Sequence, residues 1–232
     1  MSADQKPEIA SVWTRPRRQR EQLSREQIVA EAVRLLDADG LEALSMRKLG
    51  TRLDAGATSL YRHVANKDEL IELVVDEVYG ELAVPAATGA DDWRAAAAAS
   101  SESLRAMILR HPWVASVLGQ VGLIHLGPNV TKMSGRMAAV CQAAGFPAQE
   151  SELALNTLMS YVIGMATSEA AYLSLIARSG KTEQEFARSL AGEGDGAAGG
   201  AGERDPGKER DETFDYGLQR VLDGLAVRLT AI

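Results

Sequence analysis

The residues with the most distinctive chemistry form one short run, Ala57 to His63. It begins with small side chains, continues through the hydroxyls of Thr58 and Ser59, and ends with the basic groups of Arg62 and His63. Small residues permit close approach, hydroxyls and guanidinium groups hydrogen-bond to base edges, and cations attract phosphate. No buried helix face needs this set. The run favours a helix that reads DNA over an ordinary exposed polar helix.

Helical patterns on both sides of this run predict how it is positioned. A capping box at Ser24 starts a helix that Gly40 closes, and Ser45 is the expected N-cap of a second, short helix. We expect a tight turn at residues 54–56, a third helix over Ala57–Val64, and a fourth that Asn66 caps and that runs toward Leu82. Two short helices joined by a tight turn and braced by longer ones have helix-turn-helix geometry.

The composition predicts an all-α fold. Ala and Leu dominate, and the aromatic residues supply only 5% of the chain, a mixture that favours helices over sheets. The Gly-rich stretch 192–210 is expected to be a disordered loop. Helical rather than alternating periodicity predicts further helices at Asp91–Arg110, Trp113–Gly122, Asn129–Ala144, Ser151–Arg178, Thr182–Ala191 and from Phe214 to Leu229.

Charge and patterning together suggest three parts: a flexible basic arm (1–22), a helix-turn-helix domain (23–67) and a larger helical ligand-binding and dimerisation domain (68–232). Residues 1–67 hold 12 Lys and Arg against 9 Asp and Glu, whereas the whole chain has a net charge of −7. A basic end on an acidic protein orients that end toward phosphate. The arm's cations are Arg15, Arg17, Arg18 and Arg20.

Several function classes are not supported. The single cysteine, Cys141, allows no internal disulfide and no thiol cluster, and the three dispersed histidines show no spacing for a metal. We therefore expect neither metal nor cofactor. No nucleophile, base and orienting group can be assembled from motifs, so an enzyme is not expected. The polar N-terminus is no signal peptide, and polar residues interrupt the most apolar stretch, Leu153–Ala177, so we expect a cytoplasmic protein without a membrane partner.

The stretch Leu23–Leu82, and above all Leu44–Leu70, resembles the DNA-binding domain of the TetR family of repressors. The run Ser59–Val64, with Asn66 and Lys67 after it, carries the specific part. Later segments resemble the subgroup that contains the tetracycline repressors, among them Asp92-Trp93-Arg94, Arg110-His111-Pro112-Trp113 and Gly127-Pro128-Asn129.

This resemblance implies roles for individual residues. It places Arg47, Thr58, Ser59 and Arg62 at base edges, and each arginine could form a bidentate pair with guanine. The DNA backbone or groove wall would be contacted by Ser45, Met46, Tyr61, His63 and Lys67.

Two positions depart from the family pattern. Asp54 stands where the family usually has Gly, and Gly50 stands where it usually has Ala. Asp tolerates the left-handed conformation, whereas Gly50 weakens its helix by roughly 1 kcal/mol.

The basic arm has two possible roles. Its arginines would follow phosphates or enter the minor groove, unless the arm is only a solubilising tail.

The expected function is a homodimeric repressor that binds a palindromic operator and is released by a small-molecule inducer, such as an antibiotic or another exported compound. Methionines in apolar stripes suggest an adaptable cavity, although they could equally fill core gaps. The alternative is a ligand-independent, architectural helix-turn-helix protein. Candidate ligand contacts are Arg105, His125, Met133, Met137, Asn156 and Met159.

The homodimer is expected to form through the helices Ser151–Arg178 and Asp211–Leu229. Their apolar stripes exceed what one protomer is expected to cover, which favours a four-helix bundle with the symmetry mate. The stripes include Leu155, Leu158, Val162, Leu218, Leu222 and Leu225.

Overall fold

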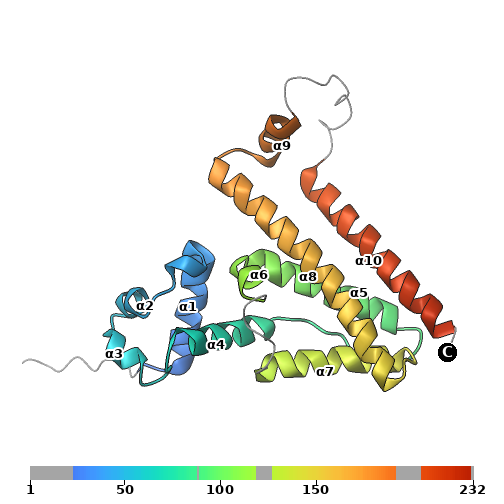
Figure 1. Cartoon of the computed structure of the whole chain (residues 1–232), viewed down its shortest axis with the longest axis horizontal. Coiled ribbons are helices and arrows are strands. Elements are labelled where there is room, and N and C mark those ends of the chain that lie inside the picture. Colours follow the sequence, from blue (N-terminus) through green and yellow to red (C-terminus); the bar gives the residue numbers. More distant parts are fainter. Residues whose placement is uncertain (1–22, 88, 119–126, 192–204, 231–232) are drawn as a thin grey trace, which may run out of the picture.

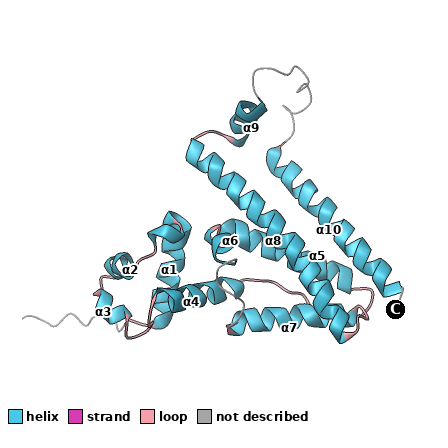
Figure 2. Ribbon diagram, viewed as in Figure 1, coloured by secondary structure: helices cyan, strands magenta, loops and turns pink. Residues whose placement is uncertain are grey.

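The structure, a computed structural model, describes residues 23–87, 89–118, 127–191 and 205–230, and every regular element in these ranges is a helix (Figures 1 and 2). The predicted all-α fold is confirmed. The elements are α1 (Arg25–Asp39), the 3-10 helix η1 (Leu41–Ala43), α2 (Met46–Arg52), α3 (Ala57–Leu60), α4 (Lys67–Tyr79), α5 (Trp93–Arg110), α6 (Trp113–Leu118), α7 (Pro128–Ala143), α8 (Ala148–Ser179), α9 (Glu183–Ala191) and α10 (Pro206–Thr230).

The N-terminal helices start where local capping predicts. At α1, the Ser24 hydroxyl accepts from the Gln27 N–H (3.2 Å) and the Gln27 side chain accepts from the Ser24 N–H (2.9 Å), which is the expected capping box. The side chains of Ser45 and Asn66 cap α2 and α4 by accepting from the backbone N–H groups of Lys48 and Glu69. These caps satisfy N–H groups that have no partner within their helices. The buried faces of the four helices then meet in one core.

The turn between α2 and α3 explains both departures from the family pattern. Asp54 adopts a φ of +48°, so an aspartate does hold the left-handed position. The Ala55 N–H donates to the Gly50 carbonyl (2.9 Å), and a Cβ at Gly50 would lie only 2.7 Å from the Ala55 carbonyl oxygen. Gly50 therefore lets the chain fold tightly back onto α2, which an alanine there would obstruct.

Two long helices, α8 and α10, lie side by side on the C-terminal side of the molecule (Figure 1). Helix α8 packs along α5, α7 and α10, and α7 also contacts α4. Helix α4 touches α1 on one side and α7 on the other, so it connects the N-terminal helices to the C-terminal ones.

Most predicted helices are present, with shifted ends. The third helix ends at Leu60 instead of Val64, and the fourth ends at Tyr79, before Leu82. The predicted loop 192–210 is wrong at its end, because α10 already begins at Pro206. There the Asp205 carboxylate accepts from the Gly207 N–H (2.9 Å), and proline occupies the first helical position, which suits its fixed φ. Residues 192–204 lie outside the described residues.

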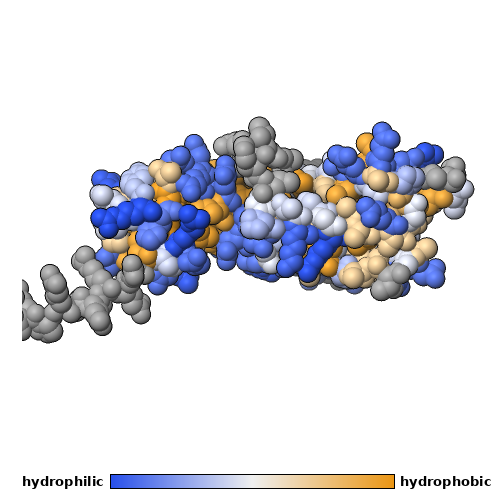
Figure 3. All heavy atoms as spheres, turned by 90° about the horizontal axis from the view of Figure 1, so that it is seen from below, coloured by the Kyte–Doolittle hydropathy of each residue, from blue (hydrophilic) through white to orange (hydrophobic). Residues whose placement is uncertain are grey.

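The surface mixes hydrophilic and apolar residues. In the view from below, apolar side chains appear at both ends of the molecule, deep orange between hydrophilic ones at the N-terminal helices and paler orange toward the opposite end (Figure 3). Across the described residues, none of the helices combines the length and the apolar character that a bilayer crossing requires.

Candidate nucleic-acid interface and candidate ligand site

The side chains predicted to contact DNA are exposed on α3 and on the turn after it. Thr58, Ser59, Tyr61 and Arg62 are all exposed, whereas Leu60 between them is fully buried. Leu60 thus anchors the short helix in the core and leaves its polar residues outward. Half of the Tyr61 side chain, 52%, is accessible. The arrangement offers hydroxyl, phenol and guanidinium groups to a single partner surface.

Two further cations, Arg47 on α2 and Lys67 at the start of α4, are also exposed. Among the described residues, neither they nor Arg62 form an ion pair. Their neighbours differ, because Lys48 pairs with Asp39 (3.0 Å) and Arg52 pairs with Glu31. Arg47, Arg62 and Lys67 therefore lack a carboxylate partner among the described residues, at positions that the family resemblance assigns to DNA.

Three of the residues that were expected to contact the DNA backbone or groove wall make contacts within the protein. The Met46 side chain is only 7% exposed and packs in the core, so it cannot line a DNA groove as expected. Met46 lies three residues before Leu49, on the same face of α2, and this face is turned toward the core. The Ser45 hydroxyl accepts from the Lys48 N–H (3.2 Å), and the carbonyl of half-buried His63 accepts from the Arg25 guanidinium (3.3 Å).

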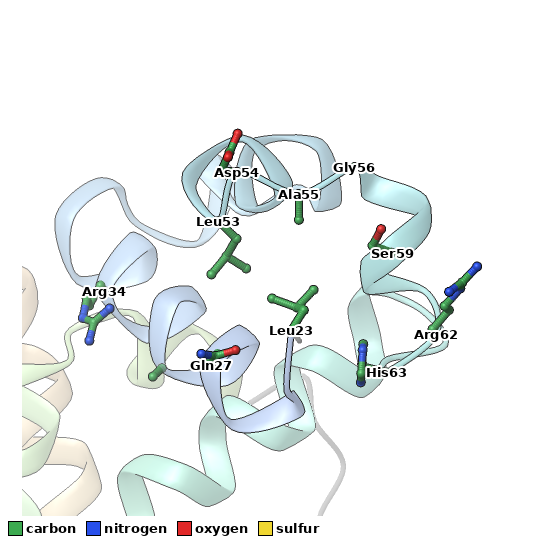
Figure 4. A pocket seen from close by; sticks show the side chains of 11 residues that line it. Leu23, Gln27, Arg34, Leu53, Asp54, Ala55, Gly56, Ser59, Arg62 and His63 are labelled. Atoms are coloured by element: carbon green, nitrogen blue, oxygen red, sulfur yellow. The ribbon is translucent and has the colours of Figure 1, made fainter. Parts of the chain in front are cut away.

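A groove of about 960 Å³ runs beside this surface (Figure 4). Leu23 and Leu53 point toward each other across it, and Arg62 points outward. Its full lining is Leu23, Gln27, Ala30, Arg34, Leu53, Asp54, Ala55, Gly56, Ser59, Arg62 and His63. The predicted arm residues Arg15, Arg17, Arg18 and Arg20, which precede Leu23, lie outside the described residues.

The candidate ligand residue Arg105 is committed to a charged cluster between helices. Its guanidinium forms a bidentate pair with Glu169 (2.7 Å for both bonds) and a third bond to Asp211 (2.8 Å). The hydrogen bonds to Glu169 raise the pKa of Arg105, and burial opposes them. Arg210 also pairs with Glu169 (3.0 Å) and with Glu183. The cluster joins α5, α8, α9 and α10, so Arg105 connects helices within the protomer.

The other candidate ligand residues do not form one site. Met137 is buried in the core, and Met133 and Met159 are half-buried against it. Asn156 is exposed on α8, so it does not line an internal cavity of the protomer. His125 lies outside the described residues.

A polar contact that the sequence analysis missed connects α1 to the start of α6. Buried His111 has Nδ1 2.7 Å from an Asp37 oxygen and Nε2 3.3 Å from Glu81. The same Asp37 oxygen accepts from the Trp113 indole N–H (2.8 Å). The Arg110-His111-Pro112-Trp113 motif was visible in the sequence, but its partner on α1 was not.

The expected dimer residues are largely wrong. Leu158, Val162, Leu218 and Leu222 are buried within the protomer, because α8 and α10 pack against each other and α5. Leu155 and Leu225 are half-buried against the same core. The large apolar residues that remain exposed on these helices are Leu153, Leu175, Tyr216 and Val227.

Among the described residues, no three His, Cys, Asp or Glu side chains are grouped so that they could hold a metal ion. Burial raises the pKa of the Cys141 thiol, which disfavours the thiolate that would be a ligand or nucleophile.

Comparison with protein families identifies both parts of the chain. Residues 28–74 match the bacterial regulatory proteins of the tetR family, and residues 84–229 match the tetracyclin repressor-like C-terminal domain. The HTH-type transcriptional repressor DrrR1 of Streptomyces coeruleorubidus is 34% identical over 213 residues, which cover 88% of this chain and 78% of DrrR1.

Two solved structures share the fold. The TetR family protein ActR of Streptomyces coelicolor in complex with actinorhodin has a TM-score of 0.69 at 30% identity, over 89% of this chain and 98% of ActR. BioQ with its double-stranded DNA operator has a TM-score of 0.63 at 26% identity, over 88% of this chain and 99% of BioQ. The relatives are named as regulators, not enzymes. This chain belongs to the TetR family and is a helix-turn-helix transcriptional regulator with a C-terminal ligand-binding domain.

Proposed function

We propose that this protein is a ligand-responsive repressor that binds a palindromic DNA operator as a homodimer and leaves it when an aromatic small molecule binds. The observation that carries the proposal is the surface of α3 and its neighbours, where Thr58, Ser59 and Arg62 are exposed and Arg47 and Lys67 are cations without a carboxylate partner among the described residues. Such cations can neutralise phosphates and pair with guanine.

The dimer interface that we propose is the outer face of α8 and α10. Tyr216 and Val227 on α10 are 67% and 68% exposed and lie eleven residues apart, about three helical turns, so they share one face. Leu153 and Leu175 on α8 are separated by about six turns and also share a face. Exposed Ser160 and other small side chains between them would allow close helix packing. A two-fold axis here would present two copies of α3 to an inverted repeat.

The class of inducer that we propose rests on the resemblance to ActR. ActR, whose structure holds actinorhodin, aligns with nearly the whole chain at 30% identity. Half-buried Met133, Met159 and Met165 supply polarizable side chains that can adapt to a planar ring system. We therefore propose a polycyclic aromatic ligand, of the kind that cells export.

Release from DNA would act through α4, which packs on both α1 and α7. A ligand that favours one spacing of the two recognition helices shifts the population away from the DNA-bound state. A tenfold loss of operator affinity needs only about 1.4 kcal/mol of differential binding.

The test begins with selection of operators from random double-stranded DNA by the purified full-length protein. We expect an inverted repeat with at least one G·C pair in each half-site, because Arg47 and Arg62 suit guanine. Actinorhodin serves as the first probe ligand, with a panel of polycyclic aromatics beside it, in thermal-shift and operator-release assays. Selection of unrelated sequences, together with no stabilisation by any compound, would instead support a ligand-independent architectural protein.

A pair of variants tests the dimer interface. Tyr216→Asp places a charge in the proposed interface but touches no core, so it should yield a folded monomer in sedimentation at micromolar concentration. Leu222→Asp is the matched comparison, because Leu222 is fully buried within the protomer and its substitution should unfold the chain. If Tyr216→Asp still sediments as a dimer, α8 and α10 do not form the interface as we propose.

A further inference from the structure

The carboxylate of Asp76 lies at the start of α7, although Asp76 belongs to α4. Its Oδ1 accepts hydrogen bonds from the backbone N–H groups of Asn129 (2.9 Å) and Val130 (3.0 Å). These are the second and third residues of α7, whose N–H groups have no partner inside the helix. Asp76 therefore caps α7 from another helix, and its negative charge suits the positive end of the helix dipole.

The contact is shaped from both sides by glycines. Gly127 occupies the N-cap position of α7 and has no side chain to cap it, and a Cβ there would collide with the Asp76 carboxylate. At the end of α4, a Cβ on Gly80 would lie 3.1 Å from Nδ2 of Asn129. That amide nitrogen in turn donates to the Asp76 carbonyl (3.1 Å). We call these residues, Asp76, Gly80, Gly127, Asn129 and Val130, the α4–α7 contact.

The same helix carries the DNA-facing end of the molecule. Lys67 is the first residue of α4 and Asp76 lies nine residues later, about 14 Å along the axis. Buried Leu70 and Val74 hold α4 in the core between these two points. Figure 1 shows the C-terminal half of α4 next to the beginning of α7, with α3 beyond the other end of α4.

We propose that Asp76 is a positioning residue that fixes α4, and with it the recognition helix α3, relative to the C-terminal helices. In the dimer this sets the distance between the two recognition helices, so the proposal rests on the proposed function. The Asp76 carboxylate keeps both hydrogen bonds only while the first turn of α7 stays in place. A displacement of that turn must therefore carry α4 with it or break the α4–α7 contact.

The test measures tolerance to half-site spacing. Asp76→Ala removes the acceptor, and we expect its preference for the selected operator over one with a base pair inserted between the half-sites to fall at least fivefold. Its affinity for DNA with a single half-site should change less than twofold, whereas a general loss of structure would weaken binding to all three DNAs. Glu77→Ala is the matched control, because it removes the same charge from the next, exposed residue of α4 and should keep the wild-type preference.

Hydrogen exchange gives a readout that needs no DNA. In Asp76→Ala the amides of Asn129 and Val130 should exchange about fivefold to tenfold faster, the factor expected when a typical N-cap is removed. Asp76→Asn retains an acceptor oxygen and should stay close to wild type in exchange and in spacing preference. If Asp76→Ala does not fold, Gly127→Ala disturbs the contact from the α7 side and should relax the spacing preference in the same way.

The outcomes separate this proposal from the proposed function. An unchanged spacing preference in folded Asp76→Ala or Gly127→Ala would overturn the positioning role. A wild-type protein without any spacing preference would overturn the dimeric operator complex instead. Equal exchange of the Asn129 and Val130 amides in wild type and Asp76→Ala would show that Asp76 does not hold α7, whatever the protein does to DNA.

Discussion

Two groups of arginines in this protein are used in opposite ways, one exposed on the N-terminal helices and one paired between the C-terminal helices. At the N-terminal end, Arg47 and Arg62 are exposed and form no ion pair among the described residues. In the C-terminal half, Arg94, Arg105 and Arg228 each bind a carboxylate on another helix. A cation without an internal partner is available to an external one, whereas a paired cation contributes to the fold. Residue type alone does not distinguish these two uses.

The largest expected effect lies in the C-terminal half. Arg105→Ala leaves Glu169, whose side chain is 10% exposed, with only Arg210 as a partner among the described residues. We expect the free energy of unfolding to fall by about 3 kcal/mol, at the low end for a broken buried pair because Arg210 remains. Denaturant titration at fixed protomer concentration measures it. Arg220→Ala, at an exposed ion pair on α10, should have a much smaller effect.

That result would sharpen the comparison if ligand binding were also measured. The paired-arginine interpretation predicts that folded Arg105→Ala still binds a ligand found in the screen with an affinity close to that of wild type. A loss of ligand affinity with an unchanged free energy of unfolding would instead show that Arg105 contacts the ligand.

The next effect belongs to the exposed arginines. Arg62→Ala should lower operator affinity by about 1–3 kcal/mol for each half-site, because a bidentate pair with guanine would disappear from it. Unfolding should not change, since the side chain forms no ion pair within the described fold. Fluorescence anisotropy with the selected operator measures the change in affinity. Arg136→Ala, an equal change of charge on an exposed part of α7, is the control and should bind as wild type does.

Local signals were predicted well and long-range ones were not. The caps Ser24, Ser45 and Asn66 were readable because a cap depends on residues within one turn. The pair of Arg105 with Glu169 joins residues 64 positions apart, so only the packed helices reveal it. The same holds for Asp76 and α7. Helix type and order follow from sequence periodicity, whereas the pocket depends on how the helices are rotated and docked.

The orientation of α2 about its own axis determines whether Met46 faces DNA or the core. The resemblance assigned it to the DNA side, but it lies in the core with Leu49. Met46→Leu conserves volume, so the free energy of unfolding should change by less than about 1.5 kcal/mol, and operator affinity should be unchanged. A clear loss of operator affinity without loss of stability would mean that Met46 reaches DNA after all, and would contradict its burial here.

The smallest expected effect concerns a paired carboxylate at the surface. Hydrogen bonds from Arg94 and Arg220 lower the pKa of Asp223, which ties α10 to the start of α5. A pKa that is lower in the folded than in the unfolded protein means that the folded state binds a proton less readily. The contribution of Asp223 to stability is therefore complete above the unfolded value of about 3.9 and disappears as the pH falls through the folded value.

This sign makes the pH dependence of a single variant informative. Asp223→Asn should melt slightly below wild type at pH 6, and the difference should vanish once the pH has fallen through the lowered pKa of Asp223. Screening of this exposed pair also predicts that the difference shrinks in high salt. Thermal melts of the two proteins side by side measure it. A difference that persists at low pH would mean that Asp223 stabilises the fold through hydrogen bonds that do not need its charge. The ion pairs of Arg94 and Arg220 would then contribute less to stability than their geometry indicates.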